Sequence, residues 1–232
     1  MIEPALLSDC RLFSGLAPDV IAALAAAARR VTAAKGEALF LQDDPAGSFF
    51  LLLKGKLKLV QNTPDGRQVT LRYIAANETA GIVSVLEKAT YPATALPVEP
   101  ITALRWGGRE FSRLLDKYPA IARNVIPLLV QRVHDVQEQL RELATERVER
   151  RVARVLIRLV RQAGKKTAEG VLIDMPLTRQ DLAEMTATTL YTVSRILSNW
   201  EAQGVVHVGR KKVVVRDARG LARIAEDLPA TR

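Results

Sequence analysis

Residues 189–201, TLYTVSRILSNWE, carry two sets of side chains that alternate at spacings of three and four. At about 100° per residue, an α-helix would turn the two sets to nearly opposite faces. One set is apolar and would face a core: Val193, Ile196, Leu197 and Trp200. The other set can form hydrogen bonds and would face outward: Tyr191, Ser194, Arg195 and Ser198. The spacing therefore predicts a helix with a buried back and a hydrogen-bonding front.

Three side chains of that front can recognise the edges of nucleic-acid bases. Arg195 can donate two parallel hydrogen bonds to O6 and N7 of guanine, a pairing worth roughly 1–3 kcal/mol of discrimination. Ser194 can approach a base edge or a thymine methyl, and Tyr191 can offer a hydroxyl or a ring. We therefore predict base contacts by Arg195, Ser194 and Tyr191, with a solvated surface charge as the alternative for Arg195.

The elements around this helix would have to position it on a duplex. Upstream, Thr178 can cap the helical segment TRQDLAEMT, of which it is the first residue, with Asp181 at the capping-box position. Downstream, VVHVGRKKVVVRD is typical of a hairpin around Gly209. Helix, tight turn, helix and basic hairpin is the order of a winged helix-turn-helix, whose second helix enters the major groove. The apolar back of that helix would close on Leu182 and Met185. Phosphate contacts are then predicted for Arg179, Gln180, Thr189, Thr192, Arg210, Lys211 and Lys212. A hairpin tip that is basic only for solubility is the alternative for the last three.

The net charge of +9 is concentrated toward the C-terminus. Residues 1–146 carry 17 Lys/Arg against 16 Asp/Glu, whereas residues 147–232 carry 17 against 9. A positive field of this kind suits a polyanion such as double-stranded DNA, or an acidic membrane surface. A solvated basic surface is the alternative.

A heptad pattern follows Pro119. Apolar residues recur with a/d spacing over three heptads, and polar residues fill most of the other positions. This narrow stripe predicts a parallel two-helix contact in a homodimer, and the alternative is one amphipathic helix packed within its own domain. Pro127 cannot donate to the carbonyl of Arg123, so we expect a kink or a late helix start there. The predicted dimer seam is Ile126, Leu129, Val133, Val136, Leu140 and Leu143.

Short strand-like segments dominate residues 34–106 and predict an antiparallel roll or barrel. They are EALFLQ, SFFLLLKGKLKLVQ, RQVTLRYI and ITALRW, with a turn at residues 62–66. Helices are expected in APDVIAALAAAARR and over residues 147–164, after which Gly164, Lys165 and Lys166 would open a loop. We therefore predict an α+β protein with an N-terminal antiparallel β-roll sensor domain (1–118), a long dimerisation helix (119–146) and a C-terminal winged helix-turn-helix domain (147–232).

This order of elements resembles the Crp-Fnr transcription regulators over nearly the whole chain. LTRQDLAEMTATTLYTVSRIL is similar to the DNA-reading signature of that family, and LFSGL with the Gly55 and Gly66 turns is similar to its cyclic-nucleotide-binding-like sensor domain. By position, Arg195 matches the reading arginine of the family and Ser194 the serine of the Fnr branch. Tyr191 replaces a glutamate that accepts from cytosine, which leaves the preferred base at that step open. The resemblance implies palindromic DNA sites, control by an effector in the N-terminal domain, and RNA polymerase as a partner.

The resemblance does not extend to the cyclic AMP signature. Family members that bind cyclic AMP use a Gly-Glu pair for the ribose and an Arg-Ser pair for the phosphate, whereas this chain has Ile82 and Pro92-Ala93 there. Between residues 77 and 100, Lys88 is the only cation beside three acids, so an anionic phosphate would meet repulsion. We therefore expect no cyclic AMP, and the single cysteine, Cys10, argues against an iron–sulfur cluster.

An apolar effector pocket is the remaining expectation, lined by Ile82, Val83, Leu86, Tyr91, Leu96, Val133 and Val136. YPATALPVEP and RVH resemble the nitric-oxide-responsive denitrification regulators, which are thought to hold haem in such a pocket. On that resemblance His134 is the possible axial ligand, and a water-exposed heptad histidine is the alternative. Cys10 would be a redox thiol, another ligand or a buried structural thiol, and His207 a wing-strand residue near phosphate.

Other classes of function are disfavoured by the same sequence. No run approaches 18 consecutive apolar residues, and the N-terminus lacks the order of a secretory signal, so we expect a cytoplasmic protein without a membrane partner. Cys10 has no histidine near it in sequence, and no paired carboxylates or phosphate-cradling loop stand in a plausible setting, so we do not expect an enzyme. The competing hypothesis is a ligand or haem sensor without DNA output, which salt-independent binding to duplex fragments would favour.

Overall fold

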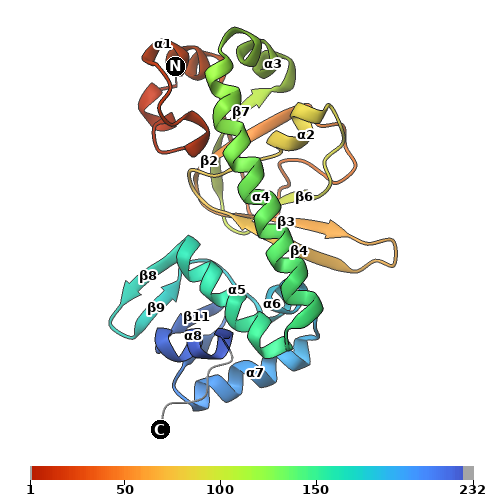
Figure 1. The fold of residues 1–232 in the computed structure, drawn as a ribbon, viewed down its shortest axis with the longest axis vertical. Coiled ribbons are helices and arrows are strands. Elements are labelled where there is room, and N and C mark those ends of the chain that lie inside the picture. Colours follow the sequence, from red (N-terminus) through yellow and green to blue (C-terminus); the bar gives the residue numbers. More distant parts are fainter. Residues whose placement is uncertain (1, 227–232) are drawn as a thin grey trace. The chain divides into compact units, whose positions relative to one another are not determined.

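The structure is a computed structural model that describes residues 2–226 of the chain (Figure 1). It divides into two compact units, residues 1–135 and 136–232, and the division falls inside the long helix α4 (Pro119–Thr145). Among the described residues, none of the helices is both long enough and apolar enough to cross a membrane.

The first unit contains two antiparallel sheets, which confirm the predicted roll. One sheet has the strand order β1 (Arg29–Ala33), β7 (Ile101–Gly107), β2 (Ser48–Lys54) and β5 (Thr79–Ala80). The other has the order β4 (Gln68–Ile74), β3 (Leu57–Asn62) and β6 (Thr94–Pro97). Gly55 makes the turn between β2 and β3 at φ 84°, and a Cβ there would come within 2.4 Å of the Pro100 carbonyl oxygen. The turn therefore requires glycine.

Two predictions for this unit are wrong. The helix expected through residue 30 ends earlier, as α1 (Pro18–Ala27), and Arg29 begins β1 because residues 29–33 pair with β7. EALFLQ forms no regular strand, and only an isolated bridge joins Phe40 to Ala95. Pairing stops there because Asp43 has a left-handed backbone at φ 68° and the Gln42 N–H donates to a side chain, Thr94 Oγ1, at 3.0 Å.

The interior of the first unit is built from two aromatic-rich clusters. In one, Trp106 stacks on Phe49 with ring centroids 5.1 Å apart and donates from Nε1 to the Leu24 carbonyl at 2.9 Å. In the other, Phe40 stacks on Tyr91 at 3.9 Å. The helical elements are two short 3₁₀ turns (Pro4–Leu7 and Arg11–Phe13), α1, α2 (Ile82–Glu87), α3 (Gly108–Lys117) and the first part of α4.

Helix α4 runs without a break through Pro127, so the predicted late start is wrong. Proline removes one helical hydrogen bond, the one to the carbonyl of residue 123. Pro127 and Arg123 are both exposed, so water can satisfy that carbonyl.

The second unit contains the predicted winged helix-turn-helix. Its helices are α5 (Val148–Ala163), α6 (Arg179–Met185), α7 (Leu190–Ala202) and α8 (Ala218–Glu226). Its sheet has the order β10 (Val206–Gly209), β11 (Lys212–Val215), β9 (Gly170–Ile173) and β8 (Gly164–Thr167). The loop predicted at residues 164–166 is instead strand β8, which pairs with β9 because Gly170, at φ 133°, lets the chain reverse.

Acidic residues at the end of α4 bind arginines of α5 within the second unit. The Glu146 carboxylate is 2% exposed and accepts from Arg154 Nε at 2.8 Å, and Glu142 lies 2.6 Å from Arg158 Nη1. Buried carboxylates are stable only when paired in this way. These ion pairs hold the junction between the two helices together.

Candidate nucleic-acid interface

Helix α6 begins with the capping box that the sequence predicts. Thr178 Oγ1 accepts from the Asp181 N–H at 3.0 Å, and Asp181 Oδ2 accepts from the Thr178 N–H at 2.9 Å. The two contacts satisfy helix N–H groups that would otherwise lack partners. They fix the start of α6 beside the exposed side chains of Arg179 and Gln180.

A tight turn joins α6 to α7 and is held from α5. Ala187 adopts a left-handed backbone at φ 47°, and the buried Thr186 hydroxyl donates to the Leu182 carbonyl at 2.6 Å. Arg151 of α5 donates from Nε to the Thr186 carbonyl at 3.1 Å and from Nη1 to the Glu146 carbonyl at 2.9 Å. One guanidinium therefore ties the end of α6 to the end of α4.

The back of α7 is buried as predicted. It packs in the core of the second unit, where Leu182 is also fully buried and Met185 is half-buried. The Trp200 indole donates to Glu149 Oε1 of α5 at 2.9 Å, a contact that the sequence pattern did not indicate. The buried residues of this face are Val193, Ile196, Leu197 and Trp200.

The front of α7 is open to solvent. Tyr191 is 75% exposed, Arg195 is exposed, and Ser194 is half-buried. Thr189 is the N-cap of the helix, where its Oγ1 accepts from the Thr192 N–H at 3.1 Å and lies 2.9 Å from the Thr192 hydroxyl. The two threonines predicted to bind phosphate thus have a capping role, which the sequence analysis missed.

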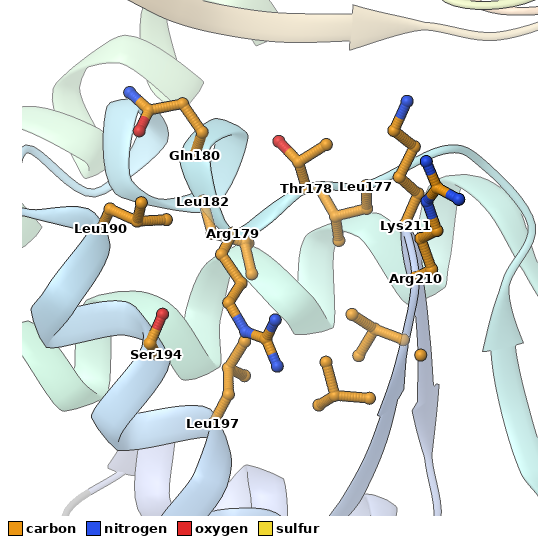
Figure 2. Close-up of a pocket in the computed structure, with 13 residues that line it drawn as sticks. Leu177, Thr178, Arg179, Gln180, Leu182, Leu190, Ser194, Leu197, Arg210 and Lys211 are labelled. Carbon is orange, nitrogen blue, oxygen red and sulfur yellow. The ribbon is translucent and has the colours of Figure 1, made fainter.

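A groove of about 360 Å³ lies between α6, α7 and the wing formed by β10 and β11 (Figure 2). Arg179, Arg210 and Lys211 line it together with leucines of both helices, and Figure 2 shows Arg179 between α7 and the wing. The Leu177 N–H donates to the Lys211 carbonyl at 3.1 Å, which holds the wing tip, and the next residue, Lys212, is exposed. Four of the predicted phosphate contacts, Arg179, Gln180, Arg210 and Lys211, therefore share one groove.

Leu190 also lines the groove and was missed as a site residue. It is the first residue of α7 and is 49% exposed. It stands four residues before Ser194, on the same side of the helix, and its apolar type at that position was the signal available in the sequence.

His207 contacts an acid in the second unit. Its Nδ1 lies 2.8 Å from Glu201 Oε1, which also accepts from the Val208 N–H at 2.9 Å. The hydrogen bond from the Val208 N–H is the largest cause that lowers the pKa of Glu201 from its ordinary value, and the contact with His207 lowers that pKa further. Glu201 thereby joins the end of α7 to strand β10.

The residues predicted to line one effector pocket differ in burial and in the cluster to which they belong. Ile82 is buried in the cluster around Trp106, whereas Tyr91 is buried in the cluster around Phe40 and accepts from the Ser48 N–H at 3.1 Å. Leu86 and Leu96 are half-buried, and Val83, Val133 and Val136 are exposed. A shared effector pocket for these side chains stays a prediction.

The predicted ligand residues differ in accessibility. His134 is exposed on α4, as expected for the alternative of a solvated heptad position. Cys10 is 2% exposed, and burial raises the pKa of its thiol to about 11, which favours a structural thiol over a redox thiol. In the part of the chain that the structure describes, His, Cys, Asp and Glu form no group of three or more placed to hold a metal ion.

The predicted seam forms an apolar stripe on α4 that the chain itself leaves uncovered. Leu140 is 65% exposed, Leu129 is half-buried, and Val130 adds an exposed residue that was not predicted. An amphipathic helix packed within its own domain would bury this stripe, so that alternative is disfavoured. The other exposed residues of the seam are Ile126, Val133, Val136 and Leu143.

A roll-like domain followed by a winged helix-turn-helix with a basic groove defines a DNA-binding regulator. Residues 30–118 match the cyclic nucleotide-binding domain family, and residues 150–224 match the Crp-like helix-turn-helix domain family. The cyclic AMP receptor protein of Thermus thermophilus is 30% identical over 214 residues, which cover 92% of this chain and 96% of that protein. This chain belongs to the Crp/Fnr family of transcription regulators.

Other relatives and solved structures agree with this assignment. The CRP-like cAMP-activated global transcriptional regulator of Mycobacterium tuberculosis is 23% identical over 220 residues, covering 95% of this chain and 98% of that protein. The structure of FixK2 from Bradyrhizobium japonicum has a TM-score of 0.75 at 20% identity and covers 88% of this chain and 99% of that one. The Thermus thermophilus catabolite activator protein has a TM-score of 0.53 at 31% identity, covering 94% and 100%. These relatives are regulators rather than enzymes.

Proposed function

We propose that the chain is a homodimeric, sequence-specific transcription regulator that reads duplex DNA with the front of α7. The observation that carries this proposal is the orientation of α7: the four apolar residues of its back are buried, while Arg195 and Tyr191 on its front are exposed on the helix that lines a cationic groove. In a helix-turn-helix, the second helix is the one that enters the major groove. Exposed donors on a rigidly packed helix are what base recognition requires.

Arg195 carries the base recognition in this proposal. Selection of binding sites from a random duplex pool should give a guanine-containing half-site for the wild-type chain, and Arg195→Ala should lose that guanine preference by about 5- to 150-fold. Arg161→Ala is the matched control. Arg161 is an exposed arginine near the C-terminal end of α5, outside the front of α7, so this variant should retain the preference for guanine. Equal sequence preference for Arg195→Ala and the wild type would refute the assignment.

Salt dependence separates this proposal from a sensor without DNA output. Phosphate contacts by Arg179, Arg210, Lys211 and Lys212 displace counterions, so the logarithm of the affinity should fall linearly with the logarithm of salt concentration. An affinity for duplex fragments that does not change between low and moderate salt would favour the competing hypothesis.

Dimerisation through the α4 stripe would place two copies of α7 on successive turns of one DNA face, about 34 Å apart, so the site should be an imperfect palindrome. The exposure of Leu140 and its neighbours supports this step. Leu140→Asp should give monomers in sedimentation analysis, because a buried unpaired carboxylate at a helix seam is costly. His134→Asp, away from the stripe, is the control and should remain dimeric.

The effector proposed for the N-terminal unit is not cyclic AMP, although the relatives from Thermus thermophilus and Mycobacterium tuberculosis are named for it. Ile82 is buried in an apolar cluster at the position of the ribose-binding glutamate, and Ala93 is buried at the position of the phosphate-binding serine. Neither side chain can form the hydrogen bonds that the nucleotide requires. Titration calorimetry with cyclic AMP should therefore detect no binding, and saturable micromolar binding would contradict the proposal.

Nitric oxide sensing through haem stays a prediction. In the single chain, His134 does not fit as an axial ligand of a buried haem because it is exposed on α4, and two of the predicted pocket residues, Ile82 and Tyr91, belong to different clusters. Titration with haemin, with and without His134→Ala, would test both the binding and the ligand. RNA polymerase is proposed as a partner on the family relationship alone.

A further inference from the structure

Two large side chains with apolar surface remain exposed at the start of α7. Leu190 is 49% and Tyr191 75% exposed. In the described part of the second unit, helix α4 aside, these are the exposed large hydrophobic residues. Leu190 is therefore an aliphatic side chain that lines the groove and remains half-exposed.

The surroundings of Leu190 point to one kind of occupant. The groove that it lines also carries Arg179, Arg210 and Lys211, and Arg195 lies on the same helix. The three cations can bind the phosphates of a DNA backbone. The apolar patch of two residues, Leu190 and Tyr191, is too small for a stable protein interface. Leu190 is also the first residue of α7, and the N-terminal residues of such a helix are the ones that contact base edges.

We propose that Leu190 is a specificity-determining residue that recognises thymine through its C5 methyl group. Thymine alone among the four bases presents a methyl group in the major groove, and apolar side chains are its partners there. This inference rests on the proposed entry of α7 into the major groove. The exposed ring of Tyr191 lies beside Leu190 in sequence and would limit access of water to the contact.

The spacing along α7 places this thymine relative to the guanine bound by Arg195. Leu190 and Arg195 are five residues apart, which corresponds to a rise of about 7.5 Å along the helix axis. One base-pair step is about 3.4 Å, so the two contacts should be about two base pairs apart within each half-site.

The test uses the duplex selected by the wild-type chain from a random pool. Each thymine is replaced in turn by deoxyuridine, which removes only the methyl group. For the wild type, affinity should fall roughly fourfold at the thymine about two steps from the guanine, and little elsewhere. Leu190→Ala should bind the thymine and deoxyuridine duplexes equally while keeping its guanine preference, and Leu190→Met should keep the discrimination.

The outcomes separate this inference from the proposed function. A wild-type chain that binds no duplex specifically overturns both. Specific binding with equal affinity for thymine and deoxyuridine at every position overturns the role of Leu190 alone. Discrimination that persists in Leu190→Ala also overturns it, and assigns the methyl contact to another side chain. Because Leu190 is half-exposed, the truncation leaves the core intact, which circular dichroism verifies.

Discussion

Arg151→Ala should loosen the helix-turn-helix without touching its DNA-facing side chains. The guanidinium donates to the carbonyls of Thr186 and Glu146, at 3.1 and 2.9 Å. Hydrogen bonds from a charged donor contribute about 1.5–3 kcal/mol each, and because Arg151 is half-buried, water replaces part of that. We therefore expect a loss of about 2–3 kcal/mol in the free energy of opening the second unit.

Hydrogen exchange of the full chain, measured by mass spectrometry, localises the effect. A loss of 2–3 kcal/mol corresponds to exchange about 30–150-fold faster in peptides from α6 and α7, while peptides from β2 and β3 should not change. Arg151→Lys should recover little, because an ammonium group does not reproduce the planar fork of two donors. Arg161→Ala, on an exposed part of the same helix, is the control. Exchange in Arg151→Ala no faster than in that control would refute the reasoning.

Three further predictions concern single contacts. Thr178→Ala removes the cap of α6 and should cost about 0.5–2 kcal/mol of unfolding free energy in urea titrations, whereas Thr178→Ser should retain most of it. The hydrogen bond from the Val208 N–H and the contact with His207 lower the pKa of Glu201 from its ordinary value of 4.5. The ionised Glu201 carboxylate therefore stabilises the folded chain above pH 4.5, and this stabilisation is lost as the pH falls through the folded-state pKa. Glu201→Gln should accordingly flatten the acid limb of the stability–pH curve, and an unchanged acid limb would contradict this. Burial raises the pKa of the Cys10 thiol to about 11, so a disulfide reagent at pH 8 should modify Cys10 only after the chain is unfolded; rapid modification of the native chain would show that the thiol is accessible.

The helix-turn-helix could be predicted because its signals are local. The cap at Thr178, the spacing of apolar residues in α7 and the valine-rich arms of the wing hairpin each act within a few residues. Apolar residues that recur at helical spacing determine which face of a helix is buried, so the exposed front of α7 could be predicted directly from the sequence. The same kind of pattern marked the apolar stripe of α4, which is exposed in the single chain, whereas the dimer contact through it stays a prediction.

The features that escaped prediction depend on partners distant in sequence. Strand β1 forms because residues 29–33 pair with β7, more than 65 residues away, although alanine-rich sequence precedes them. Strand β8 is the exception, because its partner β9 is adjacent in the chain (Thr167 pairs with Gly170), and its exposed lysines have no strand pattern of their own. Arg151 donates to the Thr186 carbonyl and Glu149 accepts from Trp200, both on other elements. The spacing of polar and apolar residues in the sequence does not predict such contacts. The effector residues were placed by resemblance, and resemblance did not reveal that Ile82 and Tyr91 belong to separate clusters.

The two tryptophans of the chain are divided between the units, Trp106 in the first and Trp200 in the second, and both are fully buried. Each unit therefore has its own intrinsic fluorophore, with a different hydrogen-bond acceptor: a backbone carbonyl for Trp106 and the Glu149 carboxylate for Trp200. A variant in which one of the two tryptophans is replaced would report on the unit that holds the other, through the emission wavelength and the quenching of its fluorescence. An effector bound to the first unit could then be followed, without any attached dye, by the optical response of the unit that holds the DNA-reading helix.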